Sequence, residues 1–147
     1  MKIFIGADHA GFKLKEKLIP FLMDLGYEVV DKGAFKYDEN DDYPDFVEPV
    51  AEAISNEQDA KGIVIGGSGE GEAMATDRFP HVRTALWYGG SLEPLKLSRE
   101  HNDANILSLG ARLISEEEAL EAVKLWLETP FSGDERHVRR IAKLDDK

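Results

Sequence analysis

Four of the six residues from Gly66 to Gly71 are glycines, in the order Gly66-Gly67-Ser68-Gly69-Glu70-Gly71, and they follow a wholly apolar run. Glycine lets the backbone turn tightly, so the N–H groups of such a loop can converge on one point and bind a phosphate or a developing oxyanion. A simple tight turn between a strand and a helix is the alternative. The loop is not a Walker A motif, because no Gly-Lys-Ser/Thr follows it, and it lacks the spacing of a dinucleotide fingerprint.

Glu72 follows this glycine loop directly. An acidic residue in the first turn of a helix is stabilised by the helix dipole, and that role would be purely structural. A carboxylate beside an oxyanion site is also the pairing that moves a proton next to a carbonyl group. Both interpretations of Glu72 stay open at this point.

Two histidines stand beside acidic residues, in Asp8-His9 and in the segment Arg99-Glu100-His101-Asn102-Asp103. An acid next to an imidazole suggests proton transfer and anion binding. Asp8 could instead cap a helix, and His101 could interact only with the dipole at a helix end. His9 could bind a metal, but no second His or Cys lies at a ligand spacing from it, so we expect no metal site.

The basic residues gather near the C-terminus, in Arg136-His137-Val138-Arg139-Arg140. On a helix, Arg136 and Arg140 lie one turn apart on one face, so their two guanidinium groups could hold one phosphate. The alternative is a solvated basic face. Arg112 could likewise bind a ligand or be an ordinary surface charge.

Short β-branched runs that alternate with helical periods must position these residues. The runs predict strands at 2–7, 27–31, 62–65, 82–87 and 105–109, and helices at 12–25, 44–55, 72–78, 93–100, 115–127 and 135–144. Ser115 and Glu118 form a capping-box pair at the start of the fifth of these helices. This alternation predicts one α/β domain over residues 1–147, a three-layer α/β/α sandwich with a five-stranded parallel sheet of the flavodoxin-like or Rossmann-like kind.

The order of the strands in the sheet does not follow from the sequence. If it is 2-1-3-4-5, the crevice at the carboxyl edge lies between the first and third strands, where Asp8-His9 and the glycine loop end those strands.

Composition excludes several classes of protein. The chain has 147 residues, a net charge of −11, 42% hydrophobic residues and no cysteine. The acidic balance argues against nucleic acid as a partner, and the absence of cysteine excludes a thiolate metal site or a cysteine nucleophile. The apolar runs are too short for a membrane span, and no signal peptide precedes the first strand, so we expect a cytoplasmic protein.

Taken together, the motifs resemble the family of type B ribose-5-phosphate isomerases and galactose-6-phosphate isomerases. The matching stretches span nearly the whole chain in family order. They are Gly6–Phe12, Asp42–Asp45, Gly66–Gly69 with Gly71, Ser98–Asn105, Gly110–Arg112, and Arg136-His137 with Arg140.

The resemblance implies a cofactor-free, metal-free aldose–ketose isomerase with an active site shared between two subunits of a homodimer, or of a dimer of dimers. In the family the base is either a cysteine at the position of Gly66 or a glutamate at that of Glu72, so this chain resembles the glutamate type. His101 and Asp8 would act in ring opening and positioning, and Ser68 with the loop would hold the enediolate oxygen. The residues implied to bind substrate are His9, Tyr43, Gly67, Gly69, Glu70, Gly71, Asn102, Arg112, Arg136 and Arg140.

Two features depart from the family pattern. Glu70 adds a negative charge to the loop, and the stretch Trp87–Leu97 is about two residues longer than usual. The resemblance implies a ribose 5-phosphate isomerase, and because of these two departures we keep an allose or galactose 6-phosphate isomerase as the alternative. A flavodoxin-like module that binds a nucleotide or flavin, and an inactive regulatory relative, are the alternatives outside catalysis.

Overall fold

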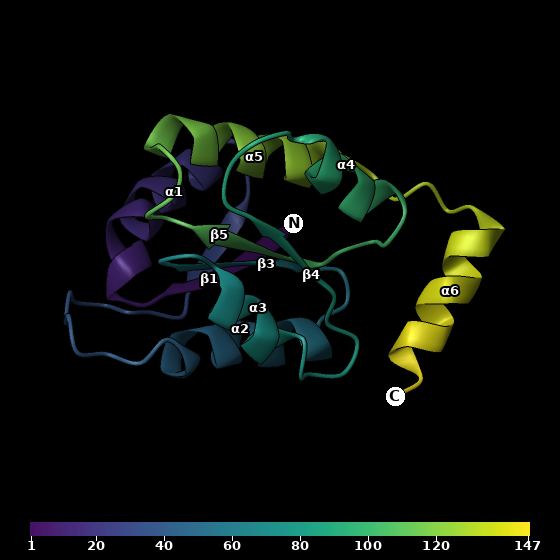
Figure 1. Cartoon of the computed structure of the whole chain (residues 1–147), viewed down its shortest axis with the longest axis horizontal. Coiled ribbons are helices and arrows are strands. Elements are labelled where there is room, and N and C mark those ends of the chain that lie inside the picture. The colour runs from purple at the N-terminus through teal and green to yellow at the C-terminus, as the bar shows by residue number, and fades with distance from the viewer.

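Five parallel strands alternate with helices in the computed structural model, which describes residues 1–147 (Figure 1). The strands are β1 Lys2–Ala7, β2 Glu28–Asp31, β3 Lys61–Gly66, β4 Thr84–Trp87 and β5 Ile106–Gly110. The helices are α1 Phe12–Asp24, α2 Pro44–Asn56, α3 Glu70–Thr76, α4 Glu93–Glu100, α5 Glu116–Glu128 and α6 Glu135–Asp145. The predicted three-layer α/β architecture is confirmed, and so is the capping box of Ser115 and Glu118.

The strand order is β2-β1-β3-β5-β4, so β4 and β5 have exchanged places relative to the order 2-1-3-4-5. Burial explains the difference. Every residue of β5 is buried, whereas β4 alternates between buried and partly exposed residues, as expected of an edge strand. The change leaves β1 and β3 paired at the centre, where the chain reverses its direction of winding. The expected crevice therefore still lies between the carboxyl ends of these two strands.

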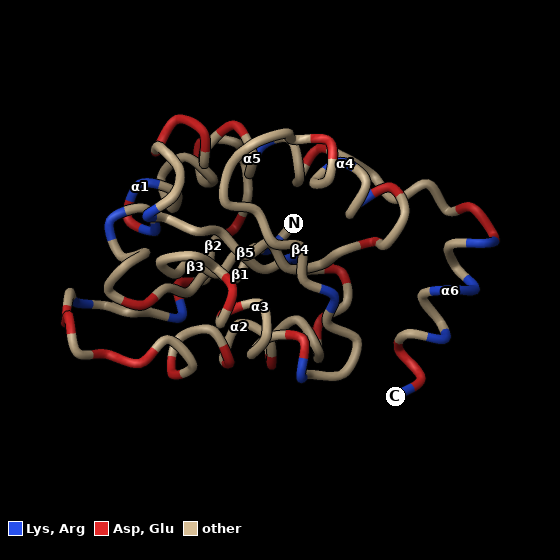
Figure 2. The backbone as a smooth tube through the Cα atoms, viewed as in Figure 1, with Lys and Arg blue, Asp and Glu red and all other residues tan.

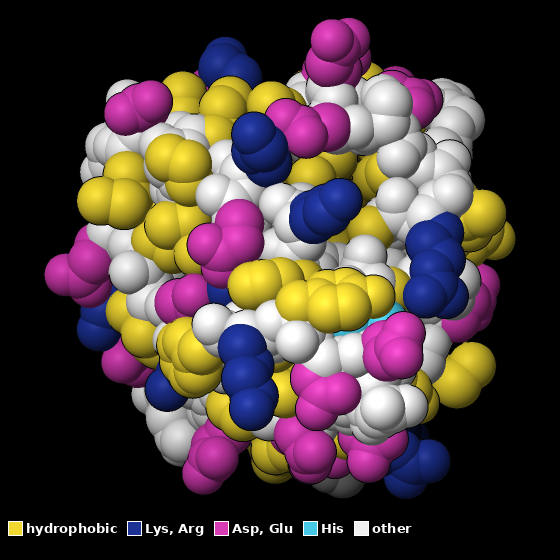
Figure 3. Space-filling model, turned by 90° about the vertical axis from the view of Figure 1, so that its left-hand side faces the viewer, with side chains coloured by type: hydrophobic (Ala, Val, Ile, Leu, Met, Phe, Trp, Pro, Cys, Tyr) yellow, Lys and Arg dark blue, Asp and Glu magenta, His cyan; other side chains and the backbone are white.

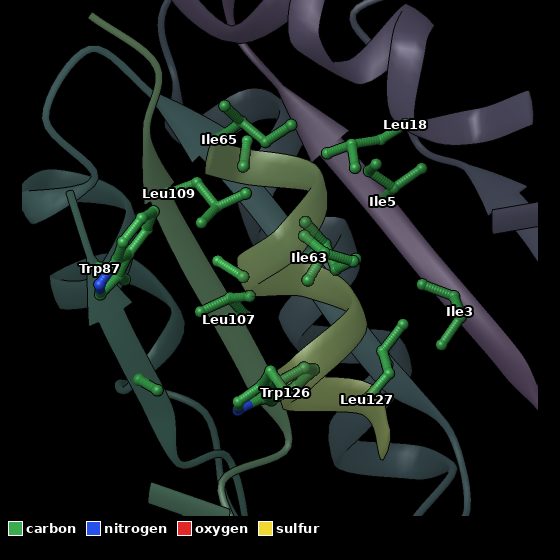
Figure 4. Packing of buried hydrophobic residues seen from close by; sticks show 14 of the residues in the cluster. Ile3, Ile5, Leu18, Ile63, Ile65, Trp87, Leu107, Leu109, Trp126 and Leu127 are labelled. Atoms are coloured by element: carbon green, nitrogen blue, oxygen red, sulfur yellow. The ribbon is translucent and has the colours of Figure 1, made fainter. Parts of the chain in front are cut away.

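Two hydrophobic clusters hold the helices against the sheet. Alternate residues of a strand face opposite sides, so Ile63 and Ile65 point to one face and Val64 to the other. The larger cluster, of 19 buried residues, packs α1, α4 and α5 on one face and includes Trp126, which is fully buried (Figure 4). The smaller one, of nine residues, packs α2 and α3 on the other face.

Helix α3 begins at Glu70, two residues earlier than predicted, which puts Glu72 in its third position. Strand β4 begins at Thr84 instead of Val82, because the N–H of Val82 donates to the carbonyl of Phe79 in a turn. No helix combines the length and the apolar character that crossing a membrane requires.

Helix α6 stands away from the three layers, at the end of the sheet opposite the loop between β2 and α2 (Figure 1). It touches the rest of the chain near its two ends. His137 stacks on His101 with ring centroids 4.4 Å apart, and Asp145 pairs with Arg83 at 2.9 Å. Between these contacts the side chains of Val138 and Leu144 are about half exposed.

Candidate active site

The glycine loop that follows β3 has free backbone donors. Backbone hydrogen bonds from the segment after β5 hold it in place, with Ala111 N–H donating to Gly66 and Arg112 N–H to Gly67. Gly69 has φ +83°, a conformation that favours glycine, and its carbonyl accepts from the hydroxyl of Ser108 at 2.7 Å. The N–H groups of Gly67 and Ser68 donate to no other backbone group, so they are available to a ligand oxygen.

The Glu72 carboxyl group is buried beneath this loop, with only 4% of the residue exposed. It lies so close to Gly66 that a Cβ atom at position 66 would overlap it. Burial raises the pKa of Glu72, and the nearby charge of Asp8 raises it further, while hydrogen bonds from the N–H groups of Glu72 and Gly69 act in the opposite direction. A buried carboxyl group with a raised pKa is suited to accept a proton near neutral pH.

The contact with Gly66 also bears on the two alternative bases that the resemblance implies, a cysteine at position 66 or a glutamate at position 72. The Glu72 carboxyl group occupies the volume that a side chain at position 66 would need. A cysteine at position 66 and a glutamate at position 72 therefore compete for one space in this backbone geometry.

Asp8 and His9 follow β1 and form a second cluster with Asp41. The Asp8 carboxylate accepts a hydrogen bond from the N–H of Ala10 at 3.0 Å and caps the short 3₁₀ turn His9–Gly11. The capping role that the sequence offered for Asp8 is therefore confirmed. His9 Nδ1 lies 2.6 Å from Asp41 Oδ1. One ligand atom from each of the three residues lies within 4.8 Å of the others, a spacing that could also hold a metal ion.

Tyr43 and Arg112 complete this edge of the site. The ring of Tyr43, at the start of α2, lies against Gly71 so closely that a Cβ there would overlap it. The guanidinium of Arg112 lies over Gly67. Figure 3 looks onto this end of the molecule, where a histidine side chain reaches the surface beside hydrophobic and acidic side chains.

His101, Asn102, Arg136 and Arg140 lie at the opposite edge of the sheet. His101 ends α4 just before β5 begins, and in a parallel sheet all strands begin at one edge. A strand rises about 3.3 Å per residue, so five to six residues separate the two edges by roughly 17–20 Å. The stack of His101 on His137 fixes α6, with its basic residues, on this far side (Figure 2).

His137 itself is buried, and its Nε2 has no hydrogen-bond partner in the chain. Burial, followed by the neighbouring His101 and Arg136, lowers the pKa of His137. It is therefore a neutral stacking partner at neutral pH.

The structure thus divides the predicted site residues into two groups. One group meets at the carboxyl edge: Asp8, His9, Tyr43, Gly67, Ser68, Gly69, Gly71, Glu72 and Arg112. Glu70 is next to this group, but its side chain is exposed. The other group lies at the far edge: His101, Asn102, Arg136 and Arg140. Sequence reasoning missed Asp41, because 32 residues separate it from His9 and no spacing pattern connects them.

These features define a parallel α/β domain that brings a buried carboxyl group, free backbone N–H donors and a histidine–carboxylate cluster together at its topological switch point. The family model described as Ribose/Galactose Isomerase matches residues 3–144, and the chain belongs to this family.

Known relatives are similar over nearly their whole length. Ribose-5-phosphate isomerase B of Mycolicibacterium paratuberculosis is 43% identical over 96% of this chain and 87% of the relative. The structure of ribose-5-phosphate isomerase B from Clostridium thermocellum is 44% identical and has a TM-score of 0.92, over 99% of this chain and 96% of that one. The enzyme from Mycoplasma genitalium, solved with bound ribulose-5-phosphate, has a TM-score of 0.93 at 38% identity, over 98% and 93% of the two chains.

Proposed function

We propose that this protein interconverts ribose 5-phosphate and ribulose 5-phosphate, with Glu72 as the base that carries a proton between C2 and C1. The observation that carries the proposal is the buried Glu72 carboxyl group beneath a loop with free N–H donors. The names and the bound sugar phosphate of the relatives support the choice of substrate.

The reaction begins with opening of the furanose ring, in which the C1 hydroxyl loses its proton and the ring oxygen gains one. Asp8 and His101 are the candidates for these transfers. Glu72 then removes the proton from C2, and the C2–H electrons form the C1–C2 double bond of an enediolate. The C2 hydroxyl gives its proton to the C1 oxygen of the enediolate. Glu72 then returns its proton to C1, and the C2 oxygen becomes the carbonyl of the ketose.

The glycine loop supplies the stabilisation that a carboxylate base needs. A carboxylate is a weak base for a C–H bond, so the energy of the enediolate must be lowered by several kcal/mol. One well-placed oxyanion donor contributes about 3 kcal/mol. The N–H groups of Gly67 and Ser68 and the hydroxyl of Ser68 are the donors we assign to this role.

The residues that we assign to the phosphate lie at both edges of the sheet, so the proposed site is shared between two chains. His9 and Arg112 lie beside the glycine loop, but Arg136 and Arg140 lie a strand length away on α6. A pentose phosphate is too short to bridge these edges. In a two-fold dimer, α6 of one protomer would reach the glycine loop of its partner and make two identical sites.

The form of α6 supports this arrangement. Its apolar side chains Val138 and Leu144 are about half exposed, and a hollow of about 600 Å³ lies between the end of α6 and the start of β4. A second protomer would cover these surfaces.

A substrate panel tests the function. Ribose, allose and galactose phosphates would be assayed for aldose–ketose conversion in the presence of a chelator. We expect turnover of ribose 5-phosphate to exceed that of the hexose phosphates, with no loss from the chelator. Preference for a hexose 6-phosphate would assign the chain to the galactose branch of the family. Absence of any turnover, together with bound flavin or nucleotide, would replace the proposal with a binding module.

Complementation tests the shared site. Glu72→Gln and Arg140→Ala proteins would be mixed, unfolded and refolded together, and assayed at a ribose 5-phosphate concentration below the wild-type KM, where each variant alone should show little activity. Random pairing makes roughly half of the dimers mixed, and each has one intact site, so activity should recover to roughly a quarter of wild type. Persistent inactivity, with mixed dimers confirmed by mass spectrometry, would contradict the shared site.

A further inference from the structure

Asp41 makes a close, buried contact with His9. Its Oδ1 lies 2.6 Å from His9 Nδ1 and also accepts the backbone N–H of His9 at 3.1 Å. The Asp41 side chain is only 8% exposed, and its second oxygen, Oδ2, is buried without a hydrogen-bond partner. Two bonds to the same residue fix both the backbone and the ring of His9.

The charges around His9 favour its protonated form. Asp41 lies in the loop before α2, Asp8 Oδ2 is 4.0 Å from His9 Nδ1, and Arg112 approaches from the segment after β5. The ring of Tyr37 packs edge-on against the ring of His9, with the two ring centroids 6.3 Å apart. The hydrogen bond that His9 donates to Asp41 is the largest influence and raises the pKa of His9, while burial and Arg112 lower this pKa and Asp8 raises it.

The burial of Asp41 also favours the protonated form of His9. A buried carboxylate with an unpartnered oxygen is costly unless an opposite charge lies beside it. His9 is the residue in direct contact with Asp41 that can carry a positive charge, and it does so only when its ring is protonated. Deprotonation of His9 would leave that carboxylate without its counter-charge.

We propose that Asp41 is a positioning residue, which holds His9 as an imidazolium and leaves Nε2–H as the donor to the substrate phosphate. The part of this inference that concerns phosphate rests on the proposed function. With Nδ1 bound to Asp41, Nε2 is the one ring nitrogen left for a ligand. A carboxylate that orients a histidine through one nitrogen and fixes the proton on the other is a general device of protein sites.

A divalent cation held by Asp8, His9 and Asp41 is the competing interpretation. A metal would need an unprotonated His9 nitrogen and a free Asp41 oxygen. His9 Nδ1 is the ring nitrogen that faces both Asp41 and Asp8, and the proton of its 2.6 Å hydrogen bond to Asp41 leaves it no lone pair for a metal, which favours the carboxylate–histidine pair.

The first test measures His9 directly, without substrate. The pKa of His9 would be determined by NMR titration of its ring signals in wild type, Asp41→Asn and Glu39→Gln. Glu39 is an exposed acid in the same loop, so its variant loses the same charge without touching His9. We expect the pKa of His9 to fall in Asp41→Asn and to stay unchanged in Glu39→Gln. The same His9 pKa in all three proteins would overturn the proposal.

The second test follows the phosphate. At a pH between the His9 pKa values that the titration gives for Asp41→Asn and for wild type, KM for ribose 5-phosphate should be about fivefold to tenfold higher in Asp41→Asn, because a charge-assisted bond becomes a neutral one, with little change in kcat. Lowering the pH below the His9 pKa measured in the variant should recharge His9 and bring the KM of the variant back to that of wild type at the same pH. Inorganic phosphate, added as a competitive probe, should lose affinity in parallel.

Two other outcomes would contradict the positioning role of Asp41. A fall in kcat with unchanged KM would make Asp41 part of the proton-transfer machinery. Manganese that broadens the His9 signals in wild type but not in Asp41→Asn would make the cluster a metal site. If wild type does not turn over ribose 5-phosphate, the proposed function fails, yet the titration of His9 still decides whether Asp41 controls its charge.

Discussion

Replacing Gly66 with alanine should misplace the catalytic carboxyl group without touching Glu72 itself. Gly66 does not have a positive φ, so alanine suits its backbone, but the added methyl group would overlap the Glu72 carboxyl group. Overpacking of this kind costs about 1–3 kcal/mol. At about 2–4 °C per kcal/mol for a protein of this size, Gly66→Ala should lower Tm by roughly 2–12 °C.

The effect on activity should be larger than the effect on stability. A displacement of about 1 Å at a reacting group can reduce turnover by about 10²-fold, so kcat should fall by that order. KM should change little, because the three atoms nearest the added methyl group all belong to Glu72 and none to Arg112 or His9.

A double-mutant cycle isolates the cause. Glu72→Ala removes the group that the new methyl would strike, so Gly66→Ala should destabilise the Glu72→Ala background less than wild type, by about 1–3 kcal/mol. Urea unfolding of the four proteins measures this difference, and the sugar-phosphate assay measures kcat. A Gly66→Ala protein with nearly wild-type activity and Tm would refute the placement of the Glu72 carboxyl group against Gly66.

The remaining predictions concern the base and the phosphate. Glu72→Gln should reduce kcat by at least about 10²-fold while sugar-phosphate binding, measured by calorimetry, stays within a few-fold. The substitution should also raise Tm at neutral pH. Burial raises the pKa of Glu72, so the folded state loses stability as the pH rises through that pKa and the carboxyl group ionises, whereas a glutamine stays neutral. In wild type, kcat should fall as pH is lowered through the same pKa, since the carboxylate is the active form, and a profile flat down to pH 4 would contradict this. Arg136→Ala or Arg140→Ala should raise KM about tenfold to a hundredfold for the phosphorylated sugar and hardly affect any turnover of free ribose. Equal losses on both sugars would make the arginines structural.

Much of the fold could be predicted from local patterns. Apolar runs and helical periods predicted β1 and α4 with their observed bounds, and the strand ends with Asp8 and the glycine loop meet at one edge as expected. These features depend on neighbours in the sequence, which is why a single chain reveals them. The positions of β4 and β5 depend on long-range packing, and only the fully buried character of β5 explains their exchange.

The candidate site was predictable in part. The pairing of Glu72 with the glycine loop is local, so sequence reasoning could propose it. The contact of Asp41 with His9 depends on how the loop after β2 folds back over β1, and no periodic pattern encodes that path. The separation of His101 and Arg140 from Glu72 follows from the parallel topology, and the shared site remains a prediction.

The most direct test of the central claim is the conversion of ribose 5-phosphate in ²H₂O, followed by NMR with wild type and Glu72→Gln in the presence of a chelator. The account predicts that wild type forms ribulose 5-phosphate with deuterium at C1, because Glu72 exchanges its proton with solvent while it carries it, and that Glu72→Gln forms almost none. Equal turnover by the two proteins, or no ribulose 5-phosphate from wild type, would contradict it.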